Sequence, residues 1–131
     1  MNKSLSRDYQ VLLKMIENVN SARDVIKRHN VDFNARSQRY IACSKDALDL
    51  CSFYMAQFGE KIKLLTDSSK DYLNKYADLG VMKYFRNVID HDYESVNKTV
   101  LASYLSILVS NQFLSALQER AKYCSQHRKR C

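Results

Sequence analysis

Apolar side chains recur at helical spacing in several stretches of the chain. The first stretch covers residues 5–28, where apolar residues fall three, four or seven positions apart and charged residues occupy other faces. The second covers residues 35–65 and predicts a helix about 45 Å long, at ~1.5 Å per residue. A short helix is expected at about 68–76, another from about residue 81, and a last long one from residue 95 or 97 to about 122. The pattern therefore predicts four main helices and a short one.

Polar segments separate these stretches and supply residues that can cap helices. The first two apolar stripes end at HNVDFN (29–34) and TDSSKD (66–71). Further breaks are expected at Gly80 and at DHDYES (90–95), where the apolar pattern is interrupted. Ser, Asp and Asn side chains accept hydrogen bonds from the free N–H groups of a first helical turn. The expected N-caps are Asp32 or Asn34, Ser68 or Ser69, and Ser95 or Asn97.

The scarcity of turn-forming residues supports a helical fold. The chain has no proline and two glycines among 131 residues, whereas a strand-rich fold needs many turns. Its length suits one domain, and a hydrophobic content of 46% is enough for a packed core. We therefore expect an all-α, up-and-down bundle of four main helices plus a short helix over residues 1–122, followed by a basic tail at 123–131.

The chain lacks the signals of membrane insertion and export. It has no run of about 18 uncharged apolar residues, and its start, MNKSLSRDYQ, lacks the apolar core of a signal peptide. We therefore expect a cytoplasmic protein with reduced cysteines. The formal net charge of +7 favours an anionic partner, such as nucleic acid, a nucleotide or an acidic protein.

The segment YFRNVIDHDYESVN at 84–97 gathers Arg86, Asn87, His91 and Tyr93. The guanidinium of an arginine can hold a phosphate with two hydrogen bonds and spread its growing charge. A histidine titrates near neutral pH, so it can give or take a proton. RNA supplies its own nucleophile, the 2′-OH. Arg86 and His91 together therefore suit RNA cleavage that needs no metal.

The spacing of this pair is not distinctive by itself. Two other histidines, His29 and His127, also follow an arginine within six or seven positions. Positions five apart on an α-helix lie about 140° apart around its axis, so Arg86 and His91 would not share a face. A joint site requires the helix to end or distort before His91, or a second chain to complete it.

An ordinary structural role explains the same residues. Arg86 and Asp90 then form a surface pair one helical turn apart. His91 lies near a helix C-terminus, where a cation interacts favourably with the helix dipole. Tyr93 is one of nine tyrosines and is simply packed.

The complete motif RNVIDHDY resembles the signature of the HepT-like proteins, a branch of the HEPN helical superfamily. That signature has an arginine, usually an asparagine, three variable residues, a histidine, any residue and a tyrosine. The segment MAQFGEKIKLLTD at 55–67 is similar to the family's second-helix segment, which usually carries a Gly-Glu pair, here Gly59 and Glu60. The similarity covers roughly residues 5–120.

This resemblance implies a homodimer with the motif lining a cleft between the subunits. It implies a metal-independent endoribonuclease, without cofactor, that is the toxin of a toxin–antitoxin pair. Arg86 would hold the scissile phosphate, Asn87 would orient the site, and His91 would be the general acid/base. The usual partner, a minimal nucleotidyltransferase (MNT) antitoxin, would add AMP groups to Tyr93 and so block RNA.

Acidic residues surround the motif. Asp90 stands where family members more often have an apolar or small residue, and Asp92 flanks His91 on the other side. The two carboxylates favour the protonated imidazole and repel a phosphate. Glu60 is either a partner of the motif or a surface glutamate. A non-catalytic HEPN-like dimer that binds RNA, a nucleotide or a protein partner therefore remains the alternative, and a purely structural helical protein is a third.

The cysteines and the C-terminal tail offer weaker candidates. Cys124, His127 and Cys131 supply three potential zinc ligands, but the spacing matches no standard zinc site, and we expect no metal. Cys43 and Cys51 lie two turns apart and are expected in the core. The segment HRKRC is either a solvated tail or a basic RNA contact.

Overall fold

The computed structural model describes residues 3–29 and 45–127. Within these ranges the chain is all-helical: it forms six α-helices and one short 3-10 helix. Their bounds are α1 Lys3–His29, α3 Lys45–Ile62, α4 Asp67–Asn74, α5 Leu79–Asp92, η1 Tyr93–Ser95, α6 Lys98–Leu108 and α7 Asn111–His127. The expected N-caps Asp32 and Asn34, residues 35–44 of the expected second helix, and Cys43 lie outside the described residues.

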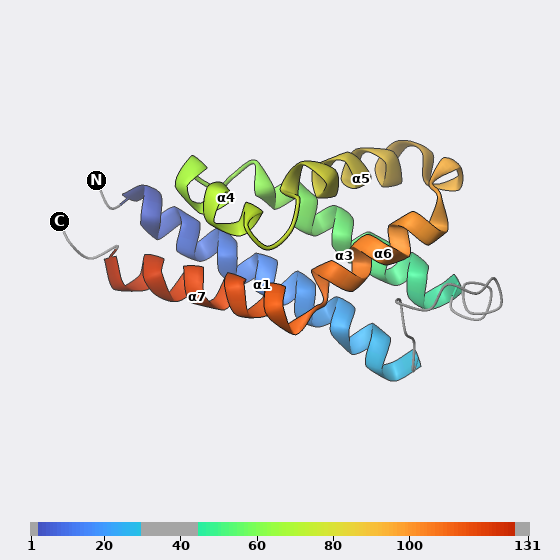
Figure 1. Ribbon diagram of the computed structural model, residues 1–131, viewed down its shortest axis with the longest axis horizontal. Helices are drawn as coiled ribbons and strands as arrows, with labels where there is room; N and C mark the ends of the chain where they lie inside the picture. The colour runs from blue at the N-terminus through green and yellow to red at the C-terminus, as the bar shows by residue number, and fades with distance from the viewer. Residues whose placement is uncertain (1–2, 30–44, 128–131) are drawn as a thin grey trace.

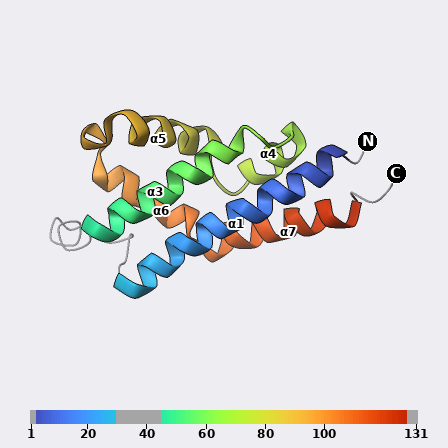
Figure 2. The same cartoon turned by 180° about the vertical axis from the view of Figure 1, so that it is seen from behind.

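The long helices pack side by side. Helix α3 lies between α1 and α5, and α7 packs along the other side of α1 (Figures 1 and 2). Helices α1 and α7 run in opposite directions, so the start of α1 and the end of α7 lie at the same end of the molecule (Figure 1). Helix α6 crosses in front of α3 in Figure 1 and contacts it. This arrangement leaves α3 and α5 to share one flank of the molecule.

A contiguous core joins these helices. Phe58 of α3 and Phe113 of α7 are almost fully buried, and their ring centroids lie 5.7 Å apart. The predicted stripe of the first helix is confirmed in part. Its Leu12 and Val19 are fully buried, whereas Ile16 packs against the core while partly exposed.

The cap of α4 differs from the expected one. Thr66, rather than Ser68 or Ser69, caps this helix: its hydroxyl oxygen accepts a hydrogen bond from the Ser69 backbone N–H at 3.3 Å. The Ser69 hydroxyl is buried and donates to Asp8 of α1 at 2.5 Å. Because Asp8 takes this hydroxyl, Ser69 lies inside the helix rather than at its start.

Helix α5 begins before Gly80. Asp78 is its N-cap, because its carboxylate accepts a hydrogen bond from the Val81 backbone N–H at 3.2 Å. Gly80 therefore lies in the first turn of the helix and does not interrupt the chain. The helix ends at Asp92, so the first half of the predicted break DHDYES belongs to α5 and only its second half, Tyr93–Ser95, forms η1.

The expected long C-terminal helix is two helices. Asn97 caps α6, as predicted, by accepting from the N–H groups of Thr99 and Val100. The apolar pattern continues through residues 109–110, but the chain bends there by 48° between α6 and α7. Arg23 of α1 stabilises the bend by donating to the Val109 carbonyl at 2.6 Å and to the Asn111 side chain at 2.8 Å. Helix α7 then continues to His127, beyond the expected end at 122.

In the described part of the chain, no single helix has both the length and the apolar composition to cross a membrane. Helices α6 and α7 taken together have that length and composition, but the chain bends by 48° between them.

Candidate functional site

Helices α3 and α5 approach each other closely at Gly59 and Arg86. A Cβ atom on Gly59 would lie 2.8 Å from the Cβ of Arg86 and 3.2 Å from the carbonyl oxygen of Met82. A real Cβ atom would force the two helices apart. The missing side chain of Gly59 therefore places Arg86 directly beside the next residue of α3, Glu60.

Three nitrogen atoms of Arg86 have partners. Nη2 forms an ion pair with Glu60, and Nε lies 3.3 Å from the Asp90 carboxylate. Nη1 donates to the Asn87 side-chain oxygen at 2.8 Å. A hydrogen bond from Lys63 and then the charge of Arg86 lower the pKa of Glu60. Asp90 is thus in contact with Arg86, as the ordinary structural role predicts, and Glu60, whose role the sequence left open, contacts it from the neighbouring helix.

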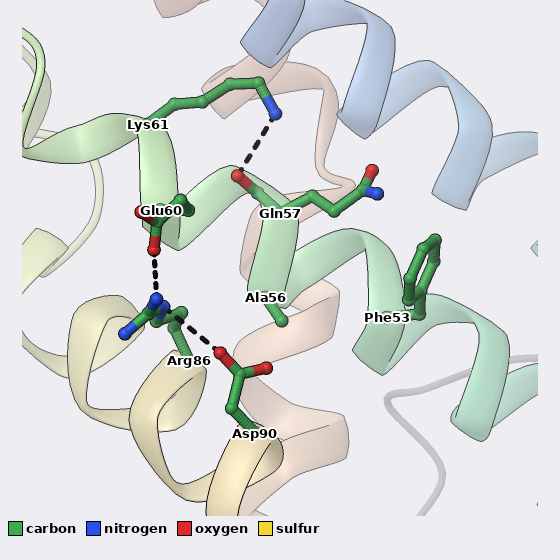
Figure 3. Close-up of a pocket in the computed structure, with 7 residues that line it drawn as sticks. All are labelled: Phe53, Ala56, Gln57, Glu60, Lys61, Arg86 and Asp90. Carbon is green, nitrogen blue, oxygen red and sulfur yellow. Dashed lines mark hydrogen bonds and ion pairs between the residues drawn. The ribbon is translucent and has the colours of Figure 1, made fainter.

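These residues form one side of an open pocket of about 340 Å³ between α3 and α5. Figure 3 shows Ala56 between Phe53 at one end and the Arg86–Asp90 pair at the other. The pocket is lined by Phe53, Ala56, Gln57, Glu60, Lys61, Arg86 and Asp90.

His91 does not join this pocket. Helix α5 continues through His91 to Asp92, so of the two ways to form a joint site the helix does not supply the first, an end or distortion before His91. In a regular helix the two side chains point about 140° apart. His91 is exposed. The Asp90 carboxylate meets Arg86 and that of Asp92 accepts from the Ser95 hydroxyl at 2.6 Å. One chain therefore brings Arg86, Asn87, Glu60 and Asp90 together but leaves His91 and Asp92 apart from them.

Tyr93 is anchored to α3. It is half-buried, and its hydroxyl donates to the Asp49 carboxylate at 2.5 Å. Asp49 also accepts from Lys45 at 3.1 Å. The ammonium of Lys98 lies 4.2 Å from the centre of the Tyr93 ring and donates to the Tyr93 carbonyl at 2.7 Å. Burial, and then the hydrogen bond to Asp49, raise the pKa of Tyr93 well above its ordinary value.

Sequence reasoning missed three residues of α3 that belong to this surface, Asp49, Phe53 and Gln57. They recur four positions apart and lead to Glu60, so they share one helical face. That periodicity was available in the sequence. It does not reveal which neighbouring helix the face meets.

The remaining candidates lie away from the pocket. Cys124 and Cys51 are buried, and burial raises the pKa of the Cys51 thiol to about 12. His127 packs against the Tyr123 ring with centroids 4.2 Å apart. Cys131 and residues 128–130 of the tail are outside the described residues.

Comparison with known proteins adds no relative. No protein-family model matches the chain, and no curated protein or solved structure matches it.

Proposed function

We propose that the protein is a metal-independent endoribonuclease of the HepT-like type, acting as a homodimeric toxin in the cytoplasm. The observation that carries the proposal is the cluster of Arg86, Asn87 and Glu60. The motif arginine and asparagine share a hydrogen bond, and the arginine meets the Gly59-Glu60 pair on α3. Both segments belong to the resemblance, and this contact joins them although Glu60 and Arg86 lie 26 positions apart in the chain.

In the proposed reaction the residues act in turn on one phosphodiester. Arg86 has five N–H groups, and its three engaged nitrogens leave one N–H free on each terminal nitrogen for a phosphate. Asn87 holds the guanidinium plane. The imidazole of His91 takes the proton of the 2′-OH or protonates the leaving oxygen. Because His91 and Arg86 of one chain diverge, the His91 that acts is supplied by the second subunit.

Neutralisation by AMP addition is part of the proposal. The modified atom is the Tyr93 hydroxyl oxygen, which a minimal nucleotidyltransferase antitoxin reaches only after the bond to Asp49 opens. An AMP group at this position puts phosphate and bulk beside the motif and excludes RNA. The wild-type protein isolated with its antitoxin is then heavier by whole AMP units on Tyr93.

The test compares cleavage of a structured RNA in chelator by the wild type, His91→Ala and His29→Ala. His29 is a matched control, because it is also an exposed helical histidine; its ring contacts the Val25 carbonyl. We expect cleavage by the wild type and by His29→Ala, and none by His91→Ala. Equal cleavage by all three would remove His91 from the mechanism. Intact-mass measurement of the wild type identifies a protein silenced by AMP on Tyr93.

A second candidate, a non-catalytic dimer that binds RNA, a nucleotide or a protein partner, is favoured by the carboxylates on Arg86. Glu60 and Asp90 offset the charge that a phosphate would meet. This candidate predicts RNA binding without new RNA ends, from a protein that carries no AMP. New ends that depend on His91 would eliminate it.

A further inference from the structure

The pocket between α3 and α5 has an aromatic end that the cleavage chemistry does not use. Phe53 is 54% exposed. Its ring meets the Tyr54 ring edge at a centroid distance of 5.5 Å and an interplanar angle of 67°. This contact orients the phenyl ring while leaving it open to solvent at the pocket.

The centre of the pocket carries an oriented amide. The side-chain oxygen of Gln57 accepts from Asn18 of α1 at 3.1 Å, and the Asn18 oxygen accepts from Lys61 at 3.0 Å. This chain of hydrogen bonds fixes the amide of Gln57 with its NH₂ group as the free end. In Figure 3 the Gln57 side chain reaches from the middle of the pocket toward the Phe53 end.

The far end of the pocket carries both signs of charge. The cations Lys61 and Arg86 line it together with the carboxylates of Glu60 and Asp90, which pair with Arg86. Lys61 lies about two helical turns along α3 from Phe53. Aromatic rings combined with nearby cations are the usual elements of sites for single-stranded nucleic acid, because the base stacks on the ring and the cation meets the phosphate. The order along the pocket is ring, amide donor and paired cation.

We propose that this pocket binds one unpaired nucleotide of single-stranded RNA, with its base stacked on Phe53 and an acceptor on the base edge bonded to Gln57. The proposal rests on the proposed function for the class of ligand, RNA, and adds where an unpaired base is held. Every lining residue except Phe53 and Ala56 is polar or charged, which suits a polar ligand such as a nucleotide better than an apolar protein surface.

The experiment uses Phe53→Trp in a His91→Ala background, so that the RNA stays intact. The natural chain has no tryptophan, so the introduced indole is the only one in the protein. The probes are a single-stranded RNA oligonucleotide and an abasic oligonucleotide of equal length and charge. We expect saturable quenching of the emission by the normal oligonucleotide and little quenching by the abasic one.

Affinities of a second pair of variants separate stacking from charge. Phe53→Ala in the same background should bind the normal oligonucleotide about 10-fold more weakly and the abasic one unchanged. Tyr84→Ala is the matched control: Tyr84 is 61% exposed on α5 and does not line the pocket. It should bind both oligonucleotides like the parent.

Three results would overturn the proposal. One is an equal loss of affinity for both oligonucleotides in Phe53→Ala, and another is no loss for either. The third is an emission that is already blue-shifted without RNA and becomes more so with protein concentration, because the ring would then be covered by a second copy.

Failure of the nuclease proposal can be distinguished from failure of the nucleotide site. Absence of cleavage by an unmodified wild type, combined with base-dependent quenching, rejects catalysis and retains the nucleotide site.

Discussion

The molecule contains two arginine-centred clusters with opposite surroundings. Arg120 of α7 is 7% exposed, and it donates to the hydroxyls of Ser69 and Ser68, each at 2.9 Å. The side chain of Arg86 is 31% exposed and faces the carboxylates of Glu60 and Asp90. The buried arginine thus has neutral partners of fixed geometry, and the accessible one has charged partners that a ligand can displace.

The buried cluster also contains a carboxylate, that of Asp8, which shares the Ser69 hydroxyl with Arg120. Asp8 is fully buried and accepts from the Thr66 backbone N–H at 3.0 Å, the Thr66 hydroxyl at 2.6 Å and the Ser69 hydroxyl at 2.5 Å. These bonds connect α1 with α4, and Arg120 connects α4 with α7. A buried cluster with its acceptors satisfied stabilises the fold, whereas a half-open cluster leaves part of its hydrogen-bonding capacity for a ligand.

Removing Asp8 should have the largest effect on stability. Asp8→Ala leaves the Thr66 and Ser69 donors unsatisfied, so we expect the free energy of unfolding to fall by about 3 kcal/mol. Urea denaturation followed by circular dichroism measures it. Asp24→Ala is the matched control, since Asp24 pairs with Arg28 on the surface of the same helix, and its loss should be barely measurable. If Arg86→Ala costs as much as Asp8→Ala, the contrast between the two clusters is wrong.

The close approach of α3 and α5 can be tested through the two glycines. Gly59→Ala places a Cβ against Arg86 and the Met82 carbonyl, so we expect a loss of about 1–3 kcal/mol together with weaker RNA binding. Gly80→Ala meets only the end of the Asp78 side chain at 3.2 Å, and it should leave stability nearly unchanged. Equal effects of both variants would show that contact with Arg86 does not decide the requirement for glycine at 59.

Removing a carboxylate partner of Arg86 should strengthen RNA binding, which tests the same comparison of the two clusters. Asp90→Asn removes the carboxylate at Nε, so we expect RNA affinity to rise about 2- to 5-fold with little change in the urea midpoint. Asp71→Asn, an exposed residue of α4, controls for the change in net charge alone. An equal rise in both variants would assign the gain to net charge and not to Arg86.

The helices could be predicted from the sequence, but not all of their ends. Asn97 was predictable because a cap residue stands directly before an apolar stripe. The bend at residues 109–110 was not, because the apolar pattern crosses it and Arg23, 86 positions away from Val109, holds it. The cap of α4 could not be predicted from the sequence either. TDSS offers several good cap residues, and the buried Asp8 selects among them by bonding Ser69.

The candidate site, like the helices, could be predicted from the sequence only in part. Arg86 and Asn87 are consecutive in the motif, so their hydrogen bond is local. The sequence left Glu60 open between a partner of the motif and a surface glutamate, and its ion pair with Arg86 joins two helices. The partner of Tyr93 was not predictable, because Asp49 lies 44 positions away on another helix. Local sequence therefore predicts which side chains carry chemistry, and tertiary packing decides which of them are held.

Tyr93 lies between the two extremes, half-buried but bonded to a carboxylate, and the loss of its hydroxyl should cost less stability than the loss of Asp8. Tyr93→Phe loses the bond to Asp49, so we expect the wild type to be more stable by about 1 kcal/mol at pH 7. Because burial raises the pKa of Tyr93 in the folded protein, the unfolded chain loses this proton first as the pH rises above about 10. The stability advantage over Tyr93→Phe should therefore hold from pH 7 to 9 and shrink above pH 10. Urea midpoints of both proteins across this range measure it, and an advantage that stays constant to pH 11 would mean that the hydroxyl is not enclosed.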